Sequence, residues 1–470
     1  MTPRYLSLLA VLPLAACAPD LGRAPQPRAA ASLASAQTLP DQNGQWPGDG
    51  WWKAYGDAQL DALIQEGLAG SPDIAAAAAR LARAEGVARQ AGATLGPSVT
   101  AKGSGTFIKQ VDSDGLPDTF GISGVPHLAG ASLNAGLDLD LWGKNRARLR
   151  AALREKDAAR VEQAEARIAL TTAIAQAYVD LSRLYVVRDV TEQTLRVRAD
   201  TADLVSQRVR NGLETEAERR QAAASVPASR ADLAAVDEQI ATVRHQLAAL
   251  VGAGPDRGLA IARPKLTATP GGALPASVGI DLVGRRPDIV AARARVEAAA
   301  ERIKVARAAY LPDISLSALI GFQAISIPGL VTGNLIYAQG GPAVSLPIFD
   351  SGKREGDLRV SRADYDTAVA DYDRTLIQAL REVADAVTAR DSLARQVRDV
   401  QASLADSEEA FRIATLRYKG GLSTYLNVLT AEDAAIIARR RNAELTARAF
   451  TLDVALVRAL GGGFAEQKNS

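Results

Sequence analysis

Arg417-Tyr418-Lys419-Gly420-Gly421-Leu422-Ser423-Thr424 is a short turn between two very long helical patterns. Neither glycine nor proline occurs in residues 357–419 before it or in residues 422–460 after it. A glycine at such a turn supplies the left-handed backbone that ends one helix, and Ser423 or Thr424 can cap the next. The stretch therefore predicts a helical hairpin.

The same device occurs earlier, as Arg208-Val209-Arg210-Asn211-Gly212-Leu213-Glu214-Thr215. Residues 145–211 contain no glycine or proline, and a helix of roughly that length spans about 100 Å. Apolar residues in the second long pattern follow a heptad with charged residues between them, which indicates that such hairpins pack side by side like a coiled coil. The heptad residues are Leu376, Leu380, Val383, Val387, Ala394, Val397 and Leu404.

Several motifs occur twice, at two constant offsets: 215 residues separate Pro72 from Pro287, and 209 separate Gly212 from Gly421. Such regularity indicates a tandem duplication. We assign residues 51–275 to the first repeat and residues 276–470 to the second. Each repeat is predicted to contain a helical segment (residues 60–93 and 280–309), two strands, a very long helix, the glycine turn and a shorter helix.

Four stretches alternate between apolar or small residues and polar ones, and each is a predicted strand: residues 99–107, 131–141, 314–322 and 338–348. Strands of about 9–11 residues cross a bilayer in a closed barrel, but a half-buried sheet in a soluble protein gives the same alternation. The export signal described next favours the membrane. An open sheet edge cannot exist in lipid, so several chains must then share one barrel. Residues 110–128 and 325–337 would be its exposed loops.

The N-terminus carries an export signal. Residues 1–16 have one positive charge, an apolar run and small residues, which is typical of a signal peptide. Leu14-Ala15-Ala16-Cys17 resembles a bacterial lipobox, and Cys17 is the only cysteine of the chain. We therefore expect lipid on Cys17, followed by a lipidated tether over residues 17–50; the alternative is ordinary cleavage beside an accidental cysteine. The residue after the cysteine is Ala18 rather than Asp, which resembles the pattern of lipoproteins that are sorted to the outer membrane.

Composition gives no indication of an enzyme or a nucleic-acid-binding protein. Lys plus Arg is 55 and Asp plus Glu is 53, for a net charge of +2, so nucleic acid is not an expected partner. His127 and His245 are the only histidines, they are far apart, and neither a phosphate loop nor a metal-ligand cluster is present. We expect no catalytic residue, no metal and no cofactor other than the covalent lipid.

Together, these features resemble the TolC-like outer membrane factor family, specifically its NodT-type lipoprotein efflux members. Residues 51–64, 284–289 and 417–431 match its motifs, and the resemblance covers essentially the whole mature chain. It implies a mainly α protein with membrane β: a homotrimer in which each chain gives four strands to a twelve-stranded outer membrane β-barrel, continued by a long α-helical barrel. The location implied is the cell outer membrane, lipid-anchored, with the helical part in the periplasm.

The resemblance also implies a function: an outer membrane channel subunit of a tripartite efflux system, a passive duct for small molecules such as drugs. Its partners would be a periplasmic adaptor (membrane fusion protein), an inner membrane RND-type or other pump, and outer membrane lipid. Two alternatives stay open, an acylated periplasmic coiled-coil scaffold without a pore and a type I protein secretion duct. The transported substrate cannot be read from the residues.

Two sets of site residues follow from the resemblance. The adaptor-docking tip would comprise Arg208, Gly212, Leu213, Arg417, Tyr418, Gly421, Leu422 and Ser423. The periplasmic gate would comprise Leu426, Asn427 and Thr430. The carboxylates that the family usually has at the gate fall here on Asn427 and Thr430, so this chain departs from the pattern. Rings of Asn or Thr would bind cations more weakly than rings of Asp.

Overall fold

The computed structural model describes residues 19–35, 37–39, 44–107, 127–267, 274–276, 278–324 and 336–466. Cys17, the expected signal peptide and nearly all of the two expected loops lie outside these residues. Within them the chain is mostly helical, with one four-stranded sheet. No helix among the described residues is both long and apolar enough to cross a membrane.

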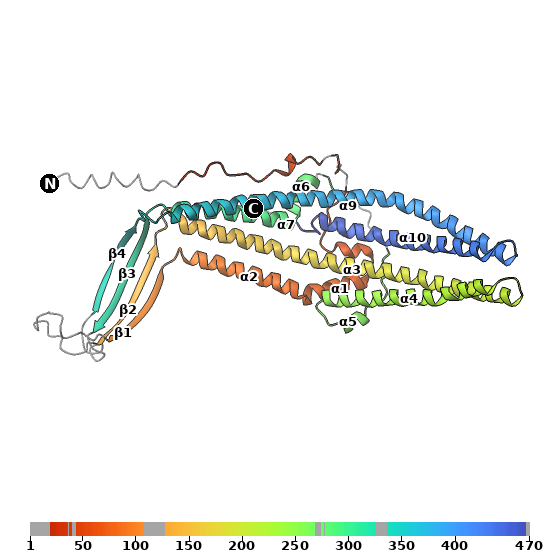
Figure 1. Ribbon diagram of the computed structural model, residues 1–470. Helices are drawn as coiled ribbons and strands as arrows, with labels where there is room; N and C mark the ends of the chain where they lie inside the picture. Colours follow the sequence, from red (N-terminus) through yellow and green to blue (C-terminus); the bar gives the residue numbers. More distant parts are fainter. Residues whose placement is uncertain are drawn as a thin grey trace, which may run out of the picture. The chain divides into compact units, whose positions relative to one another are not determined.

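Two helical hairpins of equal size dominate the fold. Helices α3 (Lys144–Arg210) and α9 (Lys353–Lys419) have 67 residues each, and α4 (Glu216–Leu250) and α10 (Tyr425–Ala459) have 35 each. Figure 1 shows α3 folding back into α4 and α9 into α10. An offset of 209 residues relates all four helix ends of one hairpin to those of the other. The predicted duplication is therefore confirmed at the level of whole elements.

Each helical segment expected before the strands is two helices, not one. The first consists of α1 (Ala58–Gly70) and α2 (Pro72–Ala93), and the second of α6 (Val278–Arg285) and α7 (Pro287–Ala308). Each segment divides at a proline because proline disfavours helical backbone in the residue before it, yet suits the first position of a new helix. Ser71 accordingly has extended backbone angles, φ −70° and ψ 128°.

The sheet is antiparallel with the order β1-β2-β3-β4. Its strands are β1 (Ser98–Phe107), β2 (His127–Asp138), β3 (Asp313–Ala324) and β4 (Ile336–Ser345). β2 and β4 start and end earlier than predicted. β2 ends before Asp140, whose φ of 43° turns the chain and whose carboxylate accepts hydrogen bonds from the amides of Asn145 and Arg146 (2.8 and 3.0 Å). β4 ends before Pro347, which has no N–H to donate.

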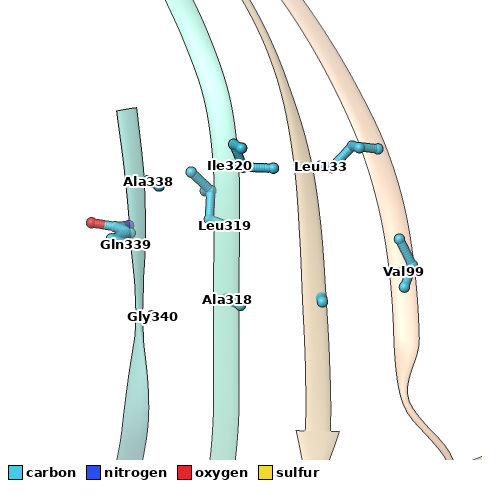
Figure 2. A pocket seen from close by; sticks show the side chains of 9 residues that line it. Val99, Leu133, Ala318, Leu319, Ile320, Ala338, Gln339 and Gly340 are labelled. Carbon is cyan, nitrogen blue, oxygen red and sulfur yellow. The ribbon is translucent and has the colours of Figure 1, made fainter. Parts of the chain in front are cut away.

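The two faces of the sheet differ in polarity, as the alternation predicted. Leu133 lies opposite Ala101 and Ile320, and on the other face Asn134 lies opposite Thr100. Figure 2 shows Val99, Leu133, Ile320 and Ala338, from four successive strands, beside a shallow hollow of about 440 Å³. One face is therefore apolar across all four strands.

The chain divides into two compact units. The first contains the sheet with residues 81–159 and 292–372, and the second contains residues 28–80, 160–291 and 373–470. In the first unit, Arg150 of α3 pairs with Glu301 of α7 at 2.9 Å and Arg154 pairs with Glu297 at 3.0 Å. Ion pairs thus join the two repeats there.

The core of the second unit forms around residues 51–64. Trp52, Tyr55, Leu60 and Leu63 are buried in one cluster with Tyr178 of α3, among others. The Tyr55 hydroxyl also donates to Asp453 of α10 at 2.7 Å. Burial of this aromatic and aliphatic surface is the main stabilising contribution in this unit.

Residues 22–25 of the expected tether lie against helix α9. In the first unit, the Arg362 guanidinium donates to the carbonyls of Gly22 and Arg23 at 3.2 and 2.6 Å, and the Tyr365 hydroxyl to that of Pro25 at 3.1 Å. Side chains of α9 therefore satisfy backbone groups of this segment that a free linker would leave to water.

Candidate functional site

The two hairpin turns end their first helices in the same way. Gly212 and Gly421 have φ of 72° and 75°, and a Cβ added at either would meet nothing within 4 Å. The Leu213 amide donates to the carbonyl of Arg208 at 2.9 Å, and the Leu422 amide to that of Arg417 at 2.8 Å. This hydrogen-bond pattern is a Schellman motif, in which glycine is needed for its backbone angles.

The helices that follow the turns are capped differently. At the first turn, Glu218 accepts a hydrogen bond from the Thr215 amide at 2.6 Å. At the second, Thr424 occupies the cap position without a side-chain cap hydrogen bond. There the Asn427 amide group donates to the Ser423 hydroxyl at 3.0 Å. The prediction that Ser423 or Thr424 caps the helix is therefore right in position, but not in side-chain bonding.

The turns expose one large apolar side chain each. Leu213 is 61% exposed and Leu422 is 73% exposed, while Arg417 is exposed and Ser423 is half-buried. Exposed leucines at a turn gain little from the fold of their own chain. Their role in docking an adaptor stays a prediction.

Two of the predicted tip residues hold the hairpins together. Tyr418 is fully buried in a cluster with Val205, Tyr425 and Val428, among others. The Arg208 guanidinium lies 4.6 Å from the centre of the Tyr418 ring and donates to the Tyr418 carbonyl at 3.1 Å. Arg208 and Tyr418 thus join the end of α3 to the end of α9, and any contribution of these two to docking stays a prediction.

The predicted gate residues share the exposed face of α10. Leu426 is 63% exposed, and Asn427 and Thr430 are exposed beside it. Tyr425 and Val428 point to the other side and are buried. Helix α10 therefore presents all three predicted gate residues outwards together.

An ion cluster around the buried Glu432 follows the gate residues along α10. The Arg198 guanidinium of α3 pairs with Glu432 and Asp433 of α10, each at 3.3 Å, and donates to the Ser229 hydroxyl of α4 at 3.0 Å. Glu432 is only 2% exposed. The sequence places Glu432 and Asp433 near the gate, but it does not reveal Arg198 as their partner, because Arg198 and Glu432 are 234 residues apart.

Burial raises the pKa of Glu432 above its ordinary value of 4.5, against the opposing effect of the Arg198 charge. A carboxyl whose folded pKa is raised contributes stability that is fully present below the unfolded pKa and is lost as the pH rises through the folded pKa. Above that pH, the buried charge of Glu432 lowers the free energy of unfolding. Replacing Glu432 by Gln removes the charge and keeps a side chain of the same shape.

We expect Glu432→Gln to match the wild type at about pH 3, well below the ordinary pKa of 4.5 of this carboxyl. At pH 7 it is expected to be more stable than the wild type, because no buried charge remains on this side chain. Midpoints of thermal unfolding, followed by circular dichroism at both pH values, test this. Glu444→Gln, an exposed glutamate on the same helix, is the control and is expected to follow the wild type throughout. A less stable Glu432→Gln at pH 7 would contradict the assignment.

The two histidines lie on different elements. His245 is exposed on α4, and β2 begins at His127. Across the described residues, no three or more His, Cys, Asp or Glu side chains come together as a metal site would require.

Comparisons with known proteins agree with this architecture. The chain matches the family model described as outer membrane efflux protein over residues 63–253 and 281–462. It is 32% identical to the fusaric acid resistance protein FusA of Burkholderia cepacia, over 90% of this chain and 80% of that protein. It is 31% identical to the multidrug resistance outer membrane protein MdtP of Shigella flexneri, over 89% of this chain and 87% of that protein.

A solved structure has the same fold. The crystal structure of the outer membrane protein VceC of Vibrio cholerae superposes with a TM-score of 0.82 at 42% identity, covering 89% of this chain and 100% of that one.

Proposed function

The chain belongs to the outer membrane efflux protein family, whose members are channel proteins, and we propose that three copies form the duct of a tripartite pump. The protein itself is an outer membrane efflux channel with a periplasmic helical part. A periplasmic adaptor would dock at the hairpin turns and link the duct to an inner membrane pump. Relatives named for resistance to fusaric acid and to multiple drugs support small toxic organic compounds as the cargo.

The main support for an assembly of three copies is the open sheet. Among the described strands, β1 and β4 are each paired on one side only. Unpaired backbone groups cost several kcal/mol each in hydrocarbon, so strands in lipid must close into a barrel. Four strands are too few to do so alone, whereas three copies supply twelve.

The same assembly gives Leu426, Asn427 and Thr430 a common role. Three copies would bring the exposed α10 faces together around one axis, with Leu426 as an apolar ring. Such a ring blocks water and ions by dewetting. Asn427 and Thr430 add neutral polar groups, so cation selectivity at this gate would be weak. A lipid on Cys17, which lies outside the described residues, would anchor the chain.

We expect Leu426→Ala to raise the conductance of the protein in planar bilayers severalfold, because it widens and wets the apolar ring. Single-channel recording compares it with the wild type and with Ile413→Ala, a matched apolar truncation on α9 where Ile413 is 44% exposed. Ile413→Ala is expected to conduct like the wild type. The scaffold without a pore predicts no conductance from any of the three, and that result would overturn the proposal.

A further inference from the structure

The sheet carries very little charge. With histidine neutral, Lys102, Asp138 and Asp313 are the only charged residues in the described strands β1 to β4. Asp138 ends β2 and Asp313 begins β3, whereas Lys102 lies in the middle of β1. Charged side chains are rare in the middle of membrane-spanning segments, and those that occur usually face a water-filled cavity and serve a function. Lys102 therefore needs an explanation.

Lys102 lies on the polar face of the sheet. Side chains alternate along a strand, so Lys102 shares its face with Thr100 and Ser104. Its partner on β2 is Ser132, which shares that face with Asn134. The apolar face, on the other side, would meet lipid in the proposed assembly. The polar face and Lys102 would then line the interior of the barrel.

The residues beside Lys102 leave its ammonium group open to solvent. Across the sheet, Lys102 lies opposite Ser132, Ser132 opposite Gly321, and Gly321 opposite Tyr337. Ser132 is small and Gly321 has no side chain, and Lys102 is exposed. In the part of the chain that the structure describes, no carboxylate forms an ion pair with Lys102. Its positive charge is therefore not neutralised within the sheet.

The two carboxylates of the strands do not cancel this charge at a distance. Asp313 forms an ion pair with Lys144 at 2.9 Å. Asp138 lies at the end of β2, about 20 Å along the strand from Ser132, the partner of Lys102. Charges in water are largely screened beyond about 8 Å at physiological ionic strength. The potential near Lys102 is therefore set by Lys102 itself.

The second repeat shows that the fold does not require a cation at this position. The offset of 215 residues that relates Pro72 to Pro287 makes Ser317 of β3 the equivalent of Lys102. Ser317 lies on the polar face too, opposite Gly136 and Gly341. The two repeats thus share the strand and its face at this level, but only the first has a charge there. A purely structural role for Lys102 does not explain this difference.

We propose that Lys102 makes the membrane part of the duct attract organic anions, which are compounds that carry a carboxylate, sulfonate or phosphate group. This rests on the proposed function and adds the charge of the cargo. Three-fold symmetry would place three copies of Lys102 at one level, and rings of lysine favour anions in a pore. Neutral hydroxyl and amide groups that can donate hydrogen bonds to an anion share this face: Thr100, Ser104, Ser132, Asn134 and Gln339.

The test is the reversal potential across a gradient of potassium chloride in planar bilayers. The parent protein carries Leu426→Ala, so that ions pass the gate, and is expected to prefer chloride to potassium. Lys102→Gln should lower the chloride-to-potassium permeability ratio at least about twofold, and Lys102→Glu should reverse the preference. Lys53→Gln removes an exposed lysine from the second unit and is the control, expected to match the parent.

Two further variants separate the charge of Lys102 from damage to the sheet. Lys102→Arg keeps the charge and should keep the ratio. Ser317→Lys adds a cation at the equivalent position and should raise the ratio. With benzoate in place of chloride, the parent should conduct the organic anion, and Lys102→Gln should again lower its permeability relative to potassium.

The outcomes distinguish this inference from the proposed function. The absence of conductance from the parent and from every variant overturns the duct and with it this inference. Conductance with an equal permeability ratio in the parent and in Lys102→Gln overturns the inference alone, whatever the effect of Ser317→Lys. A fall in the ratio that Lys102→Arg shares with Lys102→Gln shows that the charge is not the cause, and it overturns the inference as well.

Discussion

Arg286→Met is expected to destabilise the second unit by about 3 kcal/mol, because it removes the cation that two carboxylates share in a buried ion network. Arg286 is 7% exposed. Its guanidinium contacts Asp288 at 2.6 Å and Glu382 at 2.8 Å, and it donates to the carbonyl of Ala459 at 3.1 Å. It therefore ties the start of α7 to both α9 and α10. The two carboxylates retain some contact with water, so the cost is expected at the lower end of the range for such pairs.

The measurement is the thermal unfolding midpoint of the detergent-solubilised protein. Arg285→Met is the matched control: this neighbour lies 5.0 Å from the ring centre of Trp46, a contact worth about 0.5–1 kcal/mol. Adding Glu382→Met to Arg286→Met should recover part of the loss, since one unpaired charge then disappears. Equal midpoints for Arg286→Met and Arg285→Met would show that the network contributes nothing to stability.

This network also marks where prediction from the sequence stops. The match between Ser71-Pro72-Asp73 and Arg286-Pro287-Asp288 revealed the duplication. Yet the partner Glu382 lies 96 residues from Arg286, and its equivalent in the first repeat is Ala173. The two repeats thus share backbone but differ in their ion pairs. Only the packing of the helices shows which charges meet.

The predictable part of the fold rests on local chemistry. Gly212 and Gly421 end helices because of the backbone angles they permit, and period-two alternation gives a sheet its faces. The strand ends were less predictable, since β2 ends beside the carboxylate of Asp140, which accepts from amides of the following helix. At the tip, the sequence grouped Tyr418 with Leu422, but the structure buries the first and exposes the second. Exposure depends on the opposite hairpin, which a local pattern does not contain.

That difference in exposure directs the last prediction to the leucines. Leu422→Asp is expected to abolish efflux while leaving the copies assembled, because docking would have to bury a carboxylate against an apolar partner. Leu213→Asp should have the same effect at the other turn. Drug resistance in cells that carry the other two pump components is expected to fall to the level of cells without the channel.

The control is Leu259→Asp, since Leu259 on the short helix α5 (Asp256–Leu259) is 70% exposed and Leu422 is 73% exposed. A carboxylate at either position stays in water in the free protein, so neither change should affect folding. The effects of Leu259→Asp and Leu422→Asp on efflux therefore differ only if a partner excludes water from the hairpin turn. Full resistance with Leu259→Asp and none with Leu422→Asp therefore places the docking contact at the turn, whereas full resistance with Leu422→Asp removes the turn from the docking surface.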